Sequence, residues 1–142
     1  MLLLSLIFTG CFDALKTDLV PSDIEGYTVS VDHFNSTNPS LVPDYQNVTY
    51  RFVGSQVFGD GNDYDALSES YSYTVYSNTS ASVYINFGDI GYMEYELTAD
   101  SETSGSCTFT AADARYDTIY GDCSYYLSGG GYDSSYDSGY DY

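Results

Sequence analysis

Positively charged side chains are almost missing from this sequence of 142 residues. Three Lys and Arg residues stand against 21 Asp and Glu residues, which gives a formal net charge of −18 at pH 7. Such a chain is repelled by phosphate backbones and anionic lipid surfaces, because binding to either relies on Lys and Arg. We therefore expect no nucleic acid partner, and no membrane contact except through an N-terminal lipid anchor.

Histidine is almost as scarce, since His33 is the only one. A catalytic nucleophile needs a base, and that base is most often histidine. His33 stands at the end of an alternating pattern and beside a loop, so we expect it on the surface or at a strand end. The sequence also lacks a phosphate-binding loop and a nucleotide-binding fingerprint. We therefore expect no enzymatic activity and no organic cofactor.

Long hydrophobic runs are missing as well, so no segment is long enough to span a bilayer as a helix. The short apolar run in MLLLSLIFTGCF is typical of a signal peptide. It ends at Thr9-Gly10-Cys11, which resembles the lipobox of bacterial lipoproteins, where a lipidated cysteine becomes the new N-terminus. The resemblance implies a signal peptide over residues 1–10, lipidation of Cys11 and a location outside the cell or on its outer surface. A plain secretory signal and a retained apolar strand are the alternatives.

Tyrosine dominates what is present, with 18 residues in a chain that is 43% hydrophobic and 18% aromatic. These fractions are far above those of disordered acidic proteins, and the length suits one domain with a core. Tyrosine combines an apolar ring with a polar tip, so it suits half-buried strands and contact surfaces.

Apolar residues alternate with polar ones along about seven segments, which is the pattern of strands with one buried face. Short connections favour antiparallel neighbours and hence a meander, which one longer loop, residues 58–69, interrupts. Strands with one apolar face need a second layer. We therefore expect an all-β, antiparallel β-sandwich or jelly-roll-like domain over residues 26–128, with a small lipocalin-like barrel as the alternative. The segments are 26–34, 47–54, 71–76, 81–88, 92–98, 107–111 and 118–127.

Cys107 and Cys123 flank a loop centred near Arg115. If a hairpin is centred on that residue, residues whose numbers sum to 230 face each other, and the two cysteines form one such pair. Directly opposed residues on one face are close enough for a disulfide, and an exported protein meets an oxidising environment. With Cys11 assigned to the lipid, the remaining cysteine count is even, so we predict the disulfide Cys107–Cys123.

Two further kinds of site rest on short motifs. The loop GDGNDYD places several oxygen-bearing side chains close together, which suits Ca²⁺, although a solvated acidic turn explains it as well. Asn-x-Ser/Thr triplets mark candidate N-glycosylation sites, of which the one at a hairpin tip, Asn78, is the most accessible. The candidate Ca²⁺ ligands are Asp60, Asn62, Asp63 and Asp65, and the triplets begin at Asn35, Asn47 and Asn78.

The stretch GGGYDSSYDSGYDY repeats tyrosine and aspartate over residues 129–142. Extended as a strand, it has one face of Tyr and Ser and another of Asp with Ser and Gly. Such a strand lacks a partner of its own, so it can add to the edge of a sheet in its own or a neighbouring domain. A solvated tail is the alternative. The tyrosines expected to take part in assembly are Tyr132, Tyr136, Tyr140 and Tyr142.

An exported, Tyr-rich β domain with a spare strand resembles the subunits of bacterial surface fibres that assemble by strand donation. The resemblance implies a structural subunit of an extracellular fibre or surface layer that associates with copies of itself. The tail is one candidate donor strand, and residues 11–25 are either another donor or a linker. The alternative is a monomeric ligand-binding or adhesive surface lipoprotein.

Overall fold

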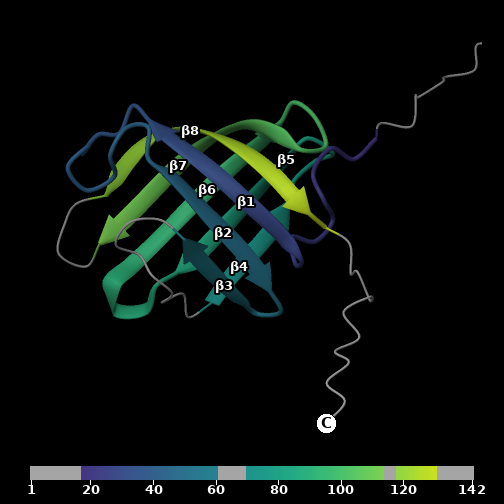
Figure 1. Ribbon diagram of the computed structural model, residues 1–142, viewed down its shortest axis with the longest axis horizontal. Coiled ribbons are helices and arrows are strands. Elements are labelled where there is room, and N and C mark those ends of the chain that lie inside the picture. Colours follow the sequence, from purple (N-terminus) through teal and green to yellow (C-terminus); the bar gives the residue numbers. More distant parts are fainter. Residues whose placement is uncertain (1–16, 61–69, 114–117, 131–142) are drawn as a thin grey trace, which may run out of the picture.

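The computed structural model describes residues 17–60, 70–113 and 118–130. Eight strands form one antiparallel sheet in the order β3-β2-β1-β8-β7-β6-β5-β4, in which β1 pairs with β8 (Figure 1). The sheet curls until its two edge strands, β3 and β4, lie side by side. The strands are β1 Tyr27–Phe34, β2 Asn47–Val53, β3 Gln56–Asp60, β4 Ser70–Val75, β5 Ser80–Asn86, β6 Gly91–Ala99, β7 Ser104–Asp113 and β8 Ile119–Gly129.

The expected all-β antiparallel meander is confirmed. The expected β-sandwich or jelly-roll arrangement is wrong. The strands form one nearly closed, barrel-shaped sheet, because the pairing of β1 with β8 joins both halves of the chain. The described residues contain eight strands instead of about seven, since β3 starts just after the second expected strand and runs into the expected loop. They include one short 3-10 helix, Gly88–Ile90, and no helix long and apolar enough to cross a membrane.

The inside of the barrel is filled with side chains. Alternation along each strand sends every second residue inwards, as in β1, where Val29 and Val31 are buried while Asp32 is exposed. Phe52 and Phe109 are the two largest of the fully buried side chains. The barrel is therefore a packed core and not an open calyx. The main core cluster consists of Ile24, Val29, Val31, Val42, Val48, Tyr50, Phe52, Val57, Val83, Ile85, Met93, Tyr95, Leu97, Cys107, Phe109, Ala111, Ile119, Cys123, Tyr125 and Leu127.

The segment before β1 packs against one end of the barrel. Ile24 is fully buried in the main core, and Val20 packs on two alanines of β5 and β6 in a smaller cluster. The backbone amide of Val20 donates a hydrogen bond to the carbonyl of Asn78, over 3.2 Å. The described part of residues 11–25 thus contributes to the core of the domain.

The β7–β8 hairpin has the predicted register. Cys107 faces Cys123 and Phe109 faces Gly121, so the numbers of opposed residues sum to 230. The two cysteines form the predicted disulfide, with their Cα atoms 4.7 Å apart. Both side chains are buried, so the bond crosslinks neighbouring strands on the inner face of the barrel.

Candidate functional site

The seam between β3 and β4 is where the sheet has its two edges. Within residues 17–60 and 70–113, no backbone ladder joins these two strands, although they lie next to each other. An edge strand presents main-chain N–H and C=O groups that can pair with a further strand. The seam is therefore the part of the described sheet where two strands end the hydrogen-bonded order.

Two tyrosines of β4 hydrogen-bond to other parts of the barrel, one across the seam and one to the segment before β1. Tyr71 in β4 donates a hydrogen bond from its hydroxyl to the carbonyl of Gly54, in the β2–β3 turn, over 2.7 Å. Its ring packs edge-on against Phe52, with the ring centroids 4.8 Å apart. Tyr73 donates to the carbonyl of Pro21 over 2.8 Å. Burial is the main cause that raises the pKa of both tyrosines, so both remain hydrogen-bond donors at neutral pH.

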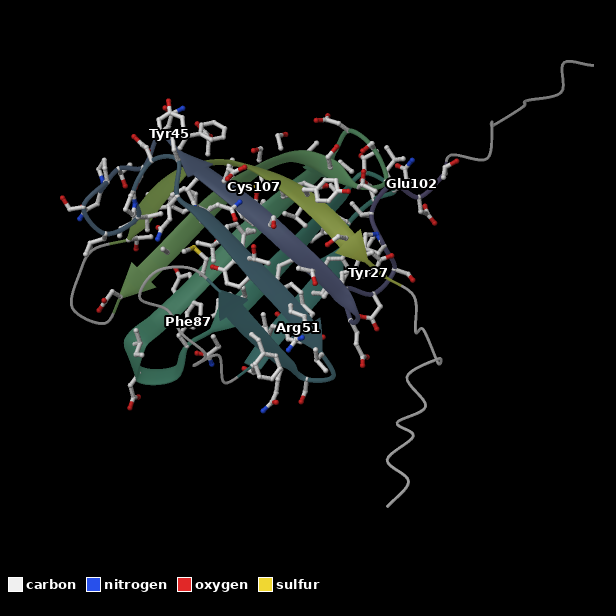
Figure 2. All side chains as sticks on the ribbon, in the orientation of Figure 1. Tyr27, Tyr45, Arg51, Phe87, Glu102 and Cys107 are labelled. Carbon is white, nitrogen blue, oxygen red and sulfur yellow. A yellow bond between two sulfur atoms is a disulfide. The ribbon has the colours of Figure 1, made fainter. Side chains whose placement is uncertain are left out.

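Arg51 lies beside this seam and is the only Lys or Arg residue among those that the structure describes. It is exposed on β2 and faces Phe58 of β3, with its guanidinium carbon 5.5 Å from the centre of the ring (Figure 2). The chain as a whole carries 21 Asp and Glu residues. A positive charge next to β3 therefore attracts an acidic segment that approaches this edge.

His33 is the centre of a second group of polar residues, in the core of the barrel. It is next to last in β1, as expected for a strand end, but it is fully buried, so the expectation of a surface position is wrong. The physical reason is that the alternation of β1 continues and brings residue 33 to the same inner face as Val29 and Val31. Phe109 packs edge-on against its ring, with the centroids 4.9 Å apart.

The hydrogen bonds of His33 fix where its proton lies. Nδ1 is 3.1 Å from the carbonyl of Gln46, and a carbonyl only accepts, so Nδ1 carries the proton. Nε2 then accepts from the Tyr95 hydroxyl over 2.9 Å, and the Tyr95 oxygen accepts from the Tyr50 hydroxyl over 3.0 Å. Burial lowers the pKa of His33, against the opposing effects of Gln46 and Asp32, so the imidazole is neutral at pH 7. This network satisfies itself inside the core, which is a structural role.

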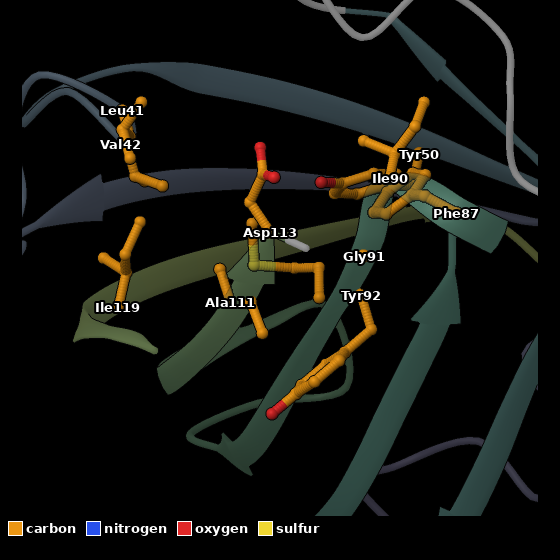
Figure 3. A pocket seen from close by; sticks show the side chains of 12 residues that line it. Leu41, Val42, Tyr50, Phe87, Ile90, Gly91, Tyr92, Ala111, Asp113 and Ile119 are labelled. Carbon is orange, nitrogen blue, oxygen red and sulfur yellow. The ribbon is translucent and has the colours of Figure 1, made fainter. Parts of the chain in front are cut away.

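A small pocket opens at the end of the barrel where β7 ends and β6 begins (Figure 3). Tyr50 links it to the network of His33, and Asp113 lies at one side of it. Its volume is about 50 Å³, which admits one or two groups of methyl or water size and no drug-sized ligand. Its apolar lining includes Leu41, Val42, Phe87, Ile90, Met93, Ala111 and Ile119.

Most of the other predicted sites lie outside the described residues. This holds for the predicted lipidation site and for most of the candidate Ca²⁺ loop, of which only the backbone of Asp60, at the end of β3, is described. Within the described ranges, no three His, Cys, Asp or Glu side chains lie close enough together to hold a metal ion. The residues outside the described ranges are Cys11, Asn62, Asp63, Asp65, Tyr132, Tyr136, Tyr140 and Tyr142.

The three candidate glycosylation asparagines have different surroundings. Asn35 and Asn47 are exposed, and their amides donate to the carboxylates of Asp122 and Asp32, over 3.0 and 2.9 Å. Asn78 is half-buried, because the segment before β1 lies against it. The expectation that Asn78 is the most accessible of the three is therefore wrong, and glycosylation at each of the three stays a prediction.

Comparison of the chain with protein-family models, with curated proteins and with solved structures finds no match. Its function therefore has to be inferred from the arrangement of its own residues. The features described above are the seam with its two sheet edges, the buried network of His33 and the small pocket.

Proposed function

We propose that the protein is a structural subunit of an extracellular fibre or surface layer, whose subunits join by strand addition at the seam of the barrel. The observation that carries this proposal is the pair of sheet edges at β3 and β4. Among the described residues, no backbone ladder joins these two strands, and the Tyr71 hydroxyl bonds across the seam to Gly54. A strand that adds to such an edge binds through main-chain hydrogen bonds. If each subunit donates a strand to the next, the chain of subunits grows into a polymer. It stops only where the rotation from one subunit to the next closes a ring.

The tail is the donor strand that fits this seam best. Its Asp face would lie on the outer side of the sheet, beside Arg51, while its Tyr face would cover the half-buried rings of Tyr71 and Tyr73. Gly129 and Gly130, which end β8 and precede the tail, have φ values of 80° and 81°, a conformation that favours glycine.

Cross-linking in the full-length protein tests which edge accepts the tail. One preparation carries Asp137→Cys in the tail and a second carries Gln56→Cys in β3, both with Cys11→Ser. We expect a mixed disulfide dimer when the two are combined and oxidised. Thr74→Cys reports addition to β4, and Ser124→Cys, in the middle of β8, is the matched exposed control. Strand addition is contradicted if the tail variant forms a dimer only with the Ser124→Cys control. It is also contradicted if the tail variant forms no dimer with any of the three acceptor variants.

Sedimentation of the wild-type protein in rising salt gives an independent readout. At −18 per subunit, repulsion between copies opposes assembly, and at 0.1 M salt this repulsion is largely screened between charges more than about 10 Å apart. We therefore expect the polymer fraction to rise with salt. A protein that stays monomeric at high concentration and high salt rules the assembly function out.

A monomeric ligand-binding lipoprotein is the second candidate, and the pocket at the end of the barrel is the observation that favours it. Its volume of about 50 Å³ restricts the guest to the end of an alkyl chain or another small apolar group. Titration with pentanol, followed through the methyl signal of Met93, tests this function. Saturable shifts in the wild type that Ala111→Leu abolishes, because leucine fills the pocket, would favour the ligand-binding function.

A further inference from the structure

The outer face of the barrel carries a trough that none of the sites above uses. It follows β7, whose outward side chains from Ser104 to Thr110 are short hydroxyl residues, while β6 and β8 place longer side chains such as Glu96, Asp122 and Tyr120 beside them. Short side chains between longer ones leave a depression along the middle strand. The outward rows are Glu94, Glu96 and Thr98 on β6, Ser104, Ser106, Thr108 and Thr110 on β7, and Tyr120, Asp122, Ser124 and Tyr126 on β8.

Two adjoining hollows make up this trough, and both include Thr108 and Asp122. Their volumes are about 340 and 380 Å³, which lie within the range of small-molecule sites. Glu96, Thr98 and Ser106 line the first end of the trough, together with Phe34. The other end is lined by Asn35, Thr37, Thr110 and Tyr120.

The chemistry of this lining selects the class of ligand. The hydroxyls of Thr108 and its neighbours donate and accept hydrogen bonds, whereas the carboxylates of Glu96 and Asp122 only accept. The ring of Tyr120 is 55% exposed at one end and offers an apolar face. Arg51, the only described cation, lies three strands away from β7 in the sheet order. The trough therefore suits a neutral molecule with many hydroxyl groups, and it repels anions.

The floor of the trough is held rigidly, which lowers the entropy cost of binding. β7 pairs along its length with both β6 and β8. Beneath the outer row, the disulfide between Cys107 and Cys123 crosslinks β7 to β8. Asp122 is held from one side by the Asn35 amide, over 3.0 Å. The hydrogen-bonding groups are thus fixed in place before a ligand arrives.

We propose that the trough along β7 binds a neutral oligosaccharide. Its hydroxyl groups donate to the carboxylates of Glu96 and Asp122 and exchange hydrogen bonds with Thr108, and the C–H face of one sugar ring packs on Tyr120. Since β7 and β8 lie in the middle of the sheet order, away from the seam, this binding does not depend on strand addition.

Native affinity electrophoresis of the full-length protein tests the proposal sharply, because a chain with a net charge of −18 migrates fast unless it binds the gel. The probes are three neutral polysaccharides cast in the gel: hydroxyethyl cellulose, galactomannan and laminarin. We expect at least one to retard the wild type. Thr108→Val, Asp122→Asn and Tyr120→Ala each weaken that retardation at least about fivefold. Thr74→Val, the same change on the outer face of β4, leaves it unchanged.

Thr108→Val and Asp122→Asn keep the shape of the side chain at exposed or half-buried outer positions, so both are expected to fold, as circular dichroism can verify. The proposal is overturned if none of the three polysaccharides retards the wild type. It is also overturned if the trough variants are retarded as strongly as the wild type. Retardation that disappears in high salt reports a charge effect and overturns it too.

Discussion

The buried imidazole of His33 makes the stability of this protein depend on pH in a way that one substitution isolates. An unfolded chain has a histidine pKa near 6.5, and burial lowers the pKa of His33 in the folded state. Below pH 6.5 the unfolded state therefore binds more protons than the folded state. The contribution of the neutral imidazole is fully present above that pH and is lost as the pH falls through it.

The size of this loss follows from the burial of the ring, which is 0% exposed. While the folded imidazole stays neutral, the free energy of unfolding falls by about 1.4 kcal/mol for each pH unit below 6.5. Lowering the pH to about 5 therefore costs at most about 2 kcal/mol through this one residue, and less where the folded imidazole begins to protonate within that range. His33→Gln removes the titration and leaves an amide that can donate to Gln46 and accept from Tyr95.

Urea unfolding of the wild type and His33→Gln near pH 8 and near pH 5 measures the effect by circular dichroism. Carboxylates that protonate in the same range contribute to both proteins, so the difference between them reports His33 alone. We expect the wild type to lose more stability than the variant, by up to about 2 kcal/mol. Asp32→Asn should enlarge the loss, because the Asp32 carboxylate raises the pKa of His33. Equal pH dependence in wild type and His33→Gln would refute the reasoning.

Three further predictions concern the hairpin, the seam and the buried tyrosines. Reduction of the disulfide, whose cysteines are 16 residues apart, should lower the free energy of unfolding by about 3 kcal/mol, and an unchanged urea midpoint under reductant contradicts this. Tyr71→Phe removes the hydrogen bond to Gly54 and keeps the ring, so it should cost about 1 kcal/mol and speed hydrogen exchange in β3, with Tyr84→Phe as the control. Burial raises the pKa of Tyr125 to about 12, so stability should be lost as the pH rises from about 10 towards that value. A tyrosinate absorbance titration with one step near pH 10, and no later phase, would count against that burial.

Local sequence patterns predict most of the strands of this fold and the register of the β7–β8 hairpin. The alternation along β1, β6 and β8 is visible in the sequence, because each strand has one buried and one polar face. Cys107 faces Cys123 because the loop of this hairpin is short. Only one register then keeps the apolar faces of both strands inside. These features depend on neighbours in the chain, so the sequence is enough to predict them.

The closure of the barrel depends on contacts that no local pattern encodes. Val31 faces Tyr125 across the β1–β8 ladder, and only this long-range pairing separates a barrel from two stacked sheets. β3 is hard to predict for a related reason. Val57 is its only buried side chain among those described, so this short strand gives little alternation to recognise in the sequence, and its pairing with β2 is seen only in the fold.

The sequence does not predict the network of His33 or the seam, because the residues that hydrogen-bond to one another there are far apart in the chain. The alternation of β1 already points His33 inwards, but its burial requires the hydroxyl of Tyr95, which is 62 residues away. The seam depends on Tyr71 and Tyr73, whose acceptors are 17 and 52 residues away. Tyrosine abundance is the only signal in the sequence, and it does not say which carbonyl each hydroxyl finds.

The shortage of cations explains why tyrosine has these roles. With three Lys and Arg residues against 21 acidic ones, few carboxylates can be held by ion pairs, so the fold relies on neutral donors. Tyr95 and Tyr50 satisfy His33 in the core, and Tyr71 fastens the seam to Gly54. Hydrogen bonds between neutral groups are hardly screened by salt, whereas repulsion between subunits is screened strongly. Salt should therefore promote association between subunits while the barrel of each subunit keeps its stability.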